Sequence, residues 1–178
     1  MSGNKCNFIP SLDDPCGINF VYRDLIICGE TMAERGIDNL PQVPSSYLAL
    51  KLLAENILDP VIEKFGPIEL TYGFCSTKLK KLITKAIVPE LDQHAAHEIN
   101  RNGKHICKRL GAAVDFLVRG KEMLDVSKWV CSKTPYDRLY FYGSSRPIHV
   151  SYGPQNSRVA YELKLSHGGK RIPGKLHL

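Results

Sequence analysis

The sequence predicts one α+β domain, in which N-terminal helices pack on a small, mainly antiparallel sheet. Apolar residues recur at helical spacing in the first half of the chain, and short alternating runs joined by turn residues fill the last third. Helices followed by antiparallel hairpins are typical of this fold class. The chain has 178 residues, 43% of them hydrophobic, which is enough to bury one core without a metal ion or a disulfide.

The chain is expected to begin with an irregular arm. Prolines and a glycine separate short apolar pieces over residues 1–20. A short apolar run follows at 25–28, and the segment ETMAERG (30–36) predicts one helical turn. A loop rich in proline and polar residues then leads to the first long helix.

The clearest helix is expected to begin at a Ser45 or Ser46 cap and to end at Gly66. Pro60 lies inside its apolar pattern and predicts a kink or a break near Asp59. The apolar residues at helical spacing are Leu48, Leu52, Leu53, Ile57, Val61, Ile62 and Phe65.

The rest of the domain is predicted as two helices and five strands. Ser76 is expected to cap a basic helix over 77–87, and an amphipathic helix is expected over 121–133. The strands are expected at 68–72, 112–118, 136–142, 148–152 and 158–165. The domain therefore covers 21–165, and 166–178 forms a Gly-rich, basic C-terminal tail.

The formal net charge of +6 favours an anionic partner such as nucleic acid, a membrane surface or an acidic cell-wall polymer. The excess is divided between residues 78–85 and the tail, which favours solvated faces over a polyanion groove. No aromatic–basic interleaving supports nucleic-acid binding. No run is apolar enough to span a bilayer and no secretory signal opens the chain, so we expect synthesis in the cytoplasm.

The six cysteines contain no C-x-x-C pair, which argues against a zinc ribbon or a thioredoxin-type motif. We expect them to be reduced and mostly buried. Cys107, close to His105, is the one candidate for a cysteine nucleophile.

Two polar residues interrupt otherwise apolar strands: Asp115 in AAVDFLV and His149 in PIHVSY. A buried carboxylate needs a partner, and a bound cation is a common one. Histidines at 94, 97 and 105 precede Asp115. Two imidazoles and one carboxylate on a tetrahedral zinc leave one position open, which is the arrangement of a catalytic site.

Simpler interpretations exist for each of these residues. A histidine on a strand is usually a satisfied core or edge residue. Asp115 has Lys108 and Arg109 nearby as alternative partners, and His94 and His97 have the spacing of polar positions on a helical turn.

Four segments between about residues 20 and 155 form a longer pattern. They are GIDNLP before LDPVIEKFGPIELTYGFCSTKL, Gln93-His94 before GAAVD (111–115), YDRL (136–139), and IHVSY (148–152). This pattern resembles the zinc D-alanyl-D-alanine carboxypeptidase and L-alanyl-D-glutamate peptidase family, of the hedgehog/DD-peptidase fold, and its phage-type branch above all.

The resemblance implies a Zn²⁺-dependent peptidase that cuts peptidoglycan stem peptides, with a zinc-bound water attacking an amide carbonyl. The implied zinc ligands are His94, Asp115 and His149. The expected substrate contacts around the motifs are Tyr72, Ser76 and Tyr142. Such a protein would act in a phage virion or as a released lysin, with other phage proteins as further partners.

The chain departs from the family pattern at three places. A loop of about residues 95–110 is inserted between the first histidine and Asp115, which leaves His97 or His105 as alternatives to His94. The substrate-binding arginine of the family falls at Cys75, and its general-base glutamate falls at about Tyr142. Glu98 in the inserted loop is the candidate replacement base. The alternative is a catalytically inactive member of the same fold that serves as a phage structural or binding module.

Overall fold

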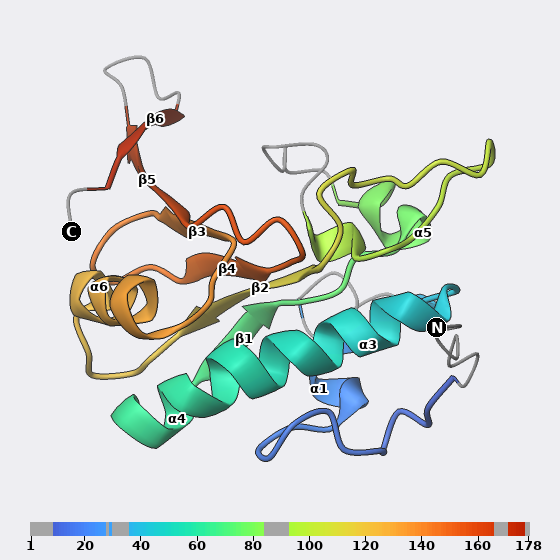
Figure 1. Ribbon diagram of the computed structural model, residues 1–178, viewed down its shortest axis with the longest axis horizontal. Helices are drawn as coiled ribbons and strands as arrows, with labels where there is room; N and C mark the ends of the chain where they lie inside the picture. Colours follow the sequence, from blue (N-terminus) through green and yellow to red (C-terminus); the bar gives the residue numbers. More distant parts are fainter. Residues whose placement is uncertain (1–8, 28, 30–35, 84–92, 166–170, 177–178) are drawn as a thin grey trace, which may run out of the picture.

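One six-stranded sheet forms the centre of the protein (Figure 1). The computed structural model describes residues 9–27, 29, 36–83, 93–165 and 171–176. The strands are β1 (Glu69–Tyr72), β2 (Ala112–Leu117), β3 (Arg138–Phe141), β4 (Ile148–Tyr152), β5 (Val159–Leu165) and β6 (Arg171–Lys175). Their order is β1-β2-β4-β3-β5-β6, and all neighbours are antiparallel except the parallel pair β3 and β5. The predicted α+β class is therefore confirmed.

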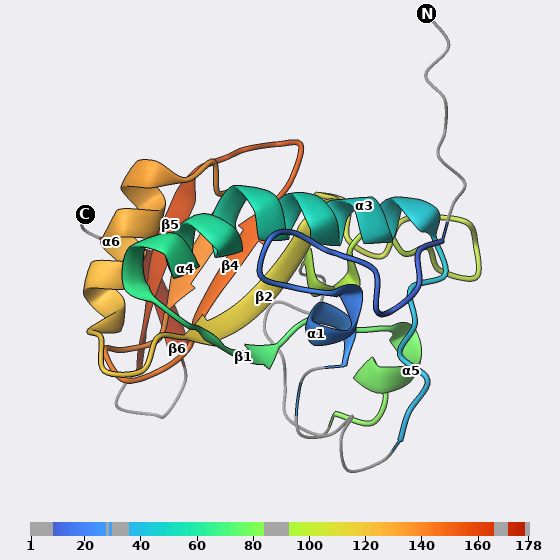
Figure 2. The same ribbon diagram turned by 90° about the horizontal axis from the view of Figure 1, so that it is seen from below.

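A long helical rod crosses one face of the sheet (Figure 2). It consists of α3 (Pro44–Leu53), a π-helical turn η1 (Ala54–Leu58) and α4 (Asp59–Phe65). The other helical segments are α1 (Tyr22–Ile26), α5 (Thr77–Lys80), the 3-10 turn η2 (Gln93–Ala95) and α6 (Met123–Lys133). Within the described residues, no helix has the length and apolarity to cross a membrane.

The rod bears out the expected irregularity before Pro60. Proline has no N–H, and its ring crowds the carbonyl four residues earlier, so the regular helical hydrogen-bond pattern cannot continue through it. The chain widens into the π turn over residues 54–58 and then resumes as α4. Gly66, with φ +89°, ends the rod as expected.

The start of the rod differs from the sequence expectation. The residue that flanks α3 is Val43, with Pro44 in the first helical position, rather than Ser45 or Ser46. Among the described residues, no side chain caps the first turn of α3. Instead, the Glu98 carboxylate holds the residues just before the helix, because it accepts hydrogen bonds from the N–H groups of Gln42 and Val43. The cap of α5 is as expected: the Ser76 hydroxyl accepts a hydrogen bond from the Leu79 N–H at 3.2 Å.

The N-terminal arm is hydrogen-bonded to the rod through the buried carboxylate of Asp59. Asp59 accepts hydrogen bonds from the N–H groups of Ile18 and Asn19 and from the Asn19 side chain, at 2.8 to 3.0 Å. The helical turn expected at 30–36 lies almost wholly outside the described residues. The basic helix expected over 77–87 is shorter than predicted: α5 ends at Lys80, residues 81–83 are not helical, and 84–87 lie outside the described residues. The expected tail contains β6, which pairs with β5 and extends the sheet beyond residue 165.

Alternation along the strands gives the sheet two different faces. The face toward the helices is apolar and buried, and its residues include Val114, Phe116, Leu139, Phe141, Ile148 and Val150. The residues between them, Asp115, Tyr140 and His149, point to the opposite face. The polar residues that interrupt the strands therefore meet on the side of the sheet away from the rod.

Gly111 fixes the point at which β2 begins. Its φ is +84°, and a Cβ atom there would overlap the carbonyl oxygen of Tyr152 on the neighbouring strand. Its N–H donates to Nε2 of His97 at 3.1 Å. Only glycine satisfies both the backbone conformation and the close approach, so this residue sets the register of Asp115.

We expect Gly111→Ala to lower the free energy of unfolding by about 3 kcal/mol or more, since it combines backbone strain with a clash against main chain. Gly103→Ala is the matched control, because Gly103 has φ +72° but open space around it. That variant should lose only about 1 kcal/mol. Urea unfolding measures both, and equal losses would contradict this account of Gly111.

Candidate metal centre

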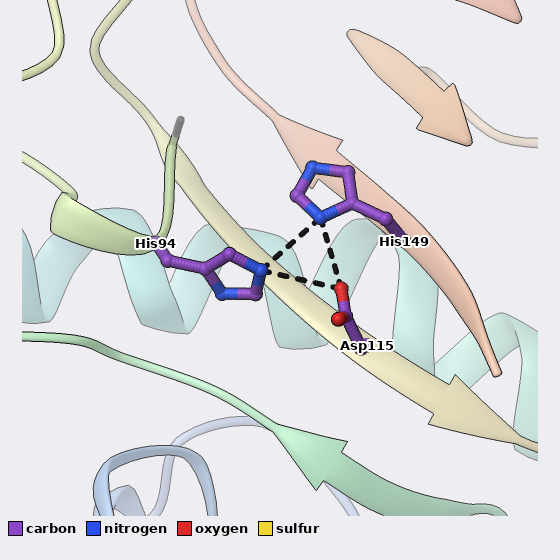
Figure 3. Close-up of side chains that lie close together, drawn as sticks. All are labelled: His94, Asp115 and His149. Atoms are coloured by element: carbon purple, nitrogen blue, oxygen red, sulfur yellow. Dashed lines mark hydrogen bonds and ion pairs between the residues drawn. The ribbon is translucent and has the colours of Figure 1, made fainter. Parts of the chain in front are cut away.

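Three elements bring His94, Asp115 and His149 together on the face of the sheet away from the rod (Figure 3). Asp115 and His149 are direct register partners on β2 and β4. His94 comes from η2, which is tied to the segment after β1 because the Cys75 N–H donates to the His94 carbonyl at 2.9 Å. Residues far apart in the sequence therefore converge on one point.

The three facing atoms have the separations of ligands around a small ion. The Nε2 atom of His94 lies 3.2 Å from Oδ1 of Asp115 and 3.1 Å from Nδ1 of His149, and the latter two atoms are 2.9 Å apart. Ligands at about 2.0–2.1 Å from a tetrahedral ion are themselves separated by about 3.3 Å. The triad thus needs only small adjustments to hold a metal ion.

A second hydrogen bond orients the His94 imidazole. Its Nδ1 atom lies 2.8 Å from the carbonyl oxygen of Gly73, which can only accept. The proton of neutral His94 is therefore on Nδ1, and Nε2 presents a lone pair to the other two residues. Metal-binding histidines are commonly held by such a hydrogen bond from the second nitrogen to a backbone carbonyl.

The electrostatics favour an ionised Asp115. Burial alone would raise the pKa of this carboxyl. In the metal-free site, a His94 imidazole that also carries a proton on Nε2 supplies positive charge and a hydrogen bond, and His149 supplies a second hydrogen bond; together these hold the pKa well below its usual range. A metal ion would take the place of that Nε2 proton. Both histidine side chains are 3% exposed, whereas Asp115 keeps 26% of its side chain exposed. An ion held by the triad would be reached from the side of Asp115.

Two tyrosines pack against the imidazoles. The ring of Tyr72 meets His94 edge-on, with centroids 4.5 Å apart, and Tyr140 lies against His149 at 5.0 Å. Tyr72 was predicted from the sequence, whereas Tyr140 was not. A signal for it existed, because a turn centred on Ser144 and Ser145 pairs residue 140 with residue 149 across the hairpin.

The turn that carries His94 is anchored by its neighbour Gln93. This side chain is buried, and its Nε2 atom donates to the Leu110 carbonyl at 2.7 Å and to the Asp137 carboxylate at 2.8 Å. Asp137 is itself fully buried and accepts hydrogen bonds from Ser157. The anchor fixes η2 against the start of β3.

The other candidate histidines have different partners. Nε2 of His97 accepts from the Gly111 N–H, and Nδ1 of His105 lies 3.1 Å from the His97 carbonyl. Neither belongs to the triad, so His94 is the first histidine of the cluster. Asp115 pairs with the two imidazoles rather than with Lys108 or Arg109.

Glu98 lies at the start of α3. Its Oε1 atom accepts from the N–H groups of Gln42 and Val43, at 3.0 and 3.1 Å, and from the Ser46 hydroxyl at 2.8 Å. These three donors fix the buried carboxylate at the start of α3 and give it a structural role. Among the described residues, Asp115 supplies the only carboxylate of the cluster.

The remaining sequence candidates, Ser76 and Tyr142, lie at the ends of regular elements. The Ser76 hydroxyl caps α5, and Tyr142 follows β3 as a half-buried residue. The four described cysteines, Cys16, Cys75, Cys107 and Cys131, are buried and form no disulfide, in line with the expectation that they are reduced. Burial raises the pKa of the Cys16 thiol to about 12, which keeps it protonated.

No protein-family model, curated protein or solved structure matches the chain.

We expect the purified wild-type protein, dialysed against zinc, to retain about one ion per chain, and His149→Ala to retain none, because two remaining ligands hold an ion poorly. His105→Ala is the matched control, since this exposed histidine lies outside the triad. Elemental analysis by mass spectrometry measures the content. If His149→Ala retains as much zinc per chain as the wild type, the ion does not bind at this site.

Replacement of Glu98 should reduce stability. We expect Glu98→Ala to lower the free energy of unfolding by about 2 kcal/mol, because it leaves the α3 N-terminus without its acceptor. The exposed Glu63 on the same rod is the control position, where alanine should change little. If Glu98→Ala unfolds at the same urea concentration as the wild type, the carboxylate does not stabilise the start of α3, and the structural role given to it is wrong.

Proposed function

We propose that the protein is a zinc-dependent hydrolase that cuts an amide bond in peptidoglycan stem peptides. The observation that carries the proposal is the triad of His94, Asp115 and His149, with its facing atoms 2.9 to 3.2 Å apart. Three ligands leave a fourth position for water or substrate, which distinguishes catalytic from structural zinc sites.

The residues present fit zinc by their chemistry. Two imidazole nitrogens and one carboxylate oxygen are a common donor set for this ion, and the Gly73 carbonyl supplies the outer hydrogen bond that such sites require. When bound, zinc supplies a Lewis acid that lowers the pKa of a bound water toward 7. The chain's own part is to hold the ligands rigidly and to keep the ion accessible beside Asp115.

The proposed substrate class has separate support. The segments between about residues 20 and 155 that resemble the peptidase family include the three ligands, and the net charge of +6 suits an anionic cell wall. The triad lies on the face of the sheet away from the rod, where Asp115 keeps 26% of its side chain exposed and gives a substrate access to the ion.

A second function is favoured by the position of Glu98. Amide hydrolysis needs a group that passes a proton to the leaving amine, and this carboxylate is already engaged by three donors at α3. A zinc-containing binding module that holds stem peptides without cutting them needs no such group. The two functions share the triad and differ only in turnover.

We expect zinc-loaded protein to release soluble fragments from purified peptidoglycan, and chelation or Asp115→Ala to reduce the rate at least 100-fold, because the ion is then lost. His105→Ala should cut at the wild-type rate. Fragments are measured by liquid chromatography with mass spectrometry. Zinc-dependent binding without fragments would favour the binding module, and a rate unaffected by chelation would contradict both.

A further inference from the structure

A single line of side chains crosses all six strands at the level of the triad. The strand register pairs each residue with the next, from one edge of the sheet to the other: Tyr72, Asp115, His149, Tyr140, Tyr161 and Lys175. Residues directly opposite each other on neighbouring strands have their side chains on the same face. The line therefore continues from the candidate metal centre to the C-terminal edge strand.

The part of the line beyond His149 presents hydrogen-bond donors. Tyr140 and Tyr161 stand side by side, with ring centroids 5.8 Å apart and an angle of 20° between the rings. Lys175 is exposed at the end of the line. In the described part of the chain, neither tyrosine hydroxyl nor the Lys175 ammonium has a hydrogen-bond or ion-pair partner. Three successive donors thus lack an acceptor.

Beyond His149, the charged side chains on this face are complementary to an anion. Arg138 precedes Tyr140 by two residues on the same face, and its buried Nε atom has no hydrogen-bond partner in the described structure. Glu162 follows Tyr161 and so faces the other side of the sheet, where it pairs with Lys164 at 3.2 Å. The acid in this hairpin is therefore directed away from the line of donors.

The length of the line sets the size of its ligand. Lys175 lies three strands beyond His149, which corresponds to about 14 Å at about 4.8 Å per strand. An extended peptide covers that distance with about four or five residues. A single amino acid bound at the metal would not reach Tyr161.

We infer that the substrate site extends from the metal over Tyr140 and Tyr161 to Lys175, and that it selects extended peptides with free carboxylates. The inference rests on the proposed function, because it specifies the substrate of the same site. Ionised acceptors make stronger hydrogen bonds to tyrosine and lysine than amides do, so carboxylates gain most from this line of donors.

The test is the binding of two probes to the zinc-loaded protein by calorimetry in about 50 mM salt, where surface charges are weakly screened. One probe is a stem pentapeptide, Ala-γGlu-Lys-Ala-Ala, with N-methylated amide bonds that resist cleavage. The other is the same peptide with both carboxylates amidated. We expect the acid to bind about tenfold more tightly than the amide.

Variants of the line should remove this preference. Lys175→Gln and Tyr161→Phe should each lower the affinity for the acid probe about three- to tenfold and leave the affinity for the amidated probe unchanged. Lys164→Gln is the matched control, because it removes the same charge from the opposite face of the same hairpin. It should leave the affinities of both probes as in the wild type.

The outcomes separate this inference from the proposed function. A preference for the acid that depends on Lys175, without cleavage of native peptidoglycan, would support the extended site and refute the hydrolase. Cleavage of peptidoglycan with equal affinity for both probes, or with a Lys175→Gln variant that binds the acid as the wild type does, would overturn the extended site and leave the hydrolase standing.

Discussion

The ionised carboxylate of Asp115 lies in the middle of the sheet, enclosed by two imidazoles, and much of the surrounding structure serves to keep it there. A carboxylate in such a place is costly unless positive charge or hydrogen-bond donors face it. Here both facing groups are histidines, each 3% exposed, and their nitrogens lie 2.9 and 3.2 Å from one Asp115 oxygen. Two imidazole nitrogens and a carboxylate oxygen directed at one point form a site for a cation.

The surrounding hydrogen bonds fix each member of this group separately. Asp115 and His149 are held by the register of β2 and β4, which Gly111 sets at the start of β2. His94 is held by the Gly73 carbonyl and by its neighbour Gln93, which reaches the buried Asp137. The loop between His94 and Asp115 is tied to the helical rod, because Ser46 donates to Glu98 and accepts from the His97 N–H. The rod thus positions the metal site from the other side of the sheet.

Local patterns in the sequence predict most of this architecture. The strand around Asp115, the hairpin that contains His149, the α6 helix and the Ser76 cap all follow from alternation, periodicity and turn residues within short windows. The anchoring of the α3 N-terminus could not be predicted this way, because its acceptor is Glu98, 55 residues after Val43. The same limit applies to the choice among His94, His97 and His105, since only the fold shows which imidazole faces Asp115. The strand β6 was missed because its residues, RIPGK, contain a proline and a glycine and few apolar side chains.

X-ray absorption spectroscopy at the zinc edge of the zinc-loaded protein tests the central claim most directly, because it reports the ligand atoms around the ion. The account predicts a first shell of four nitrogen and oxygen atoms at about 2.0–2.1 Å, with the outer-shell scattering of two imidazoles and no sulfur. Scattering from sulfur at about 2.3 Å would place the ion on cysteines instead, and a shell without imidazole would show that His94 and His149 do not bind it. Either result would contradict the site on which the proposed chemistry depends.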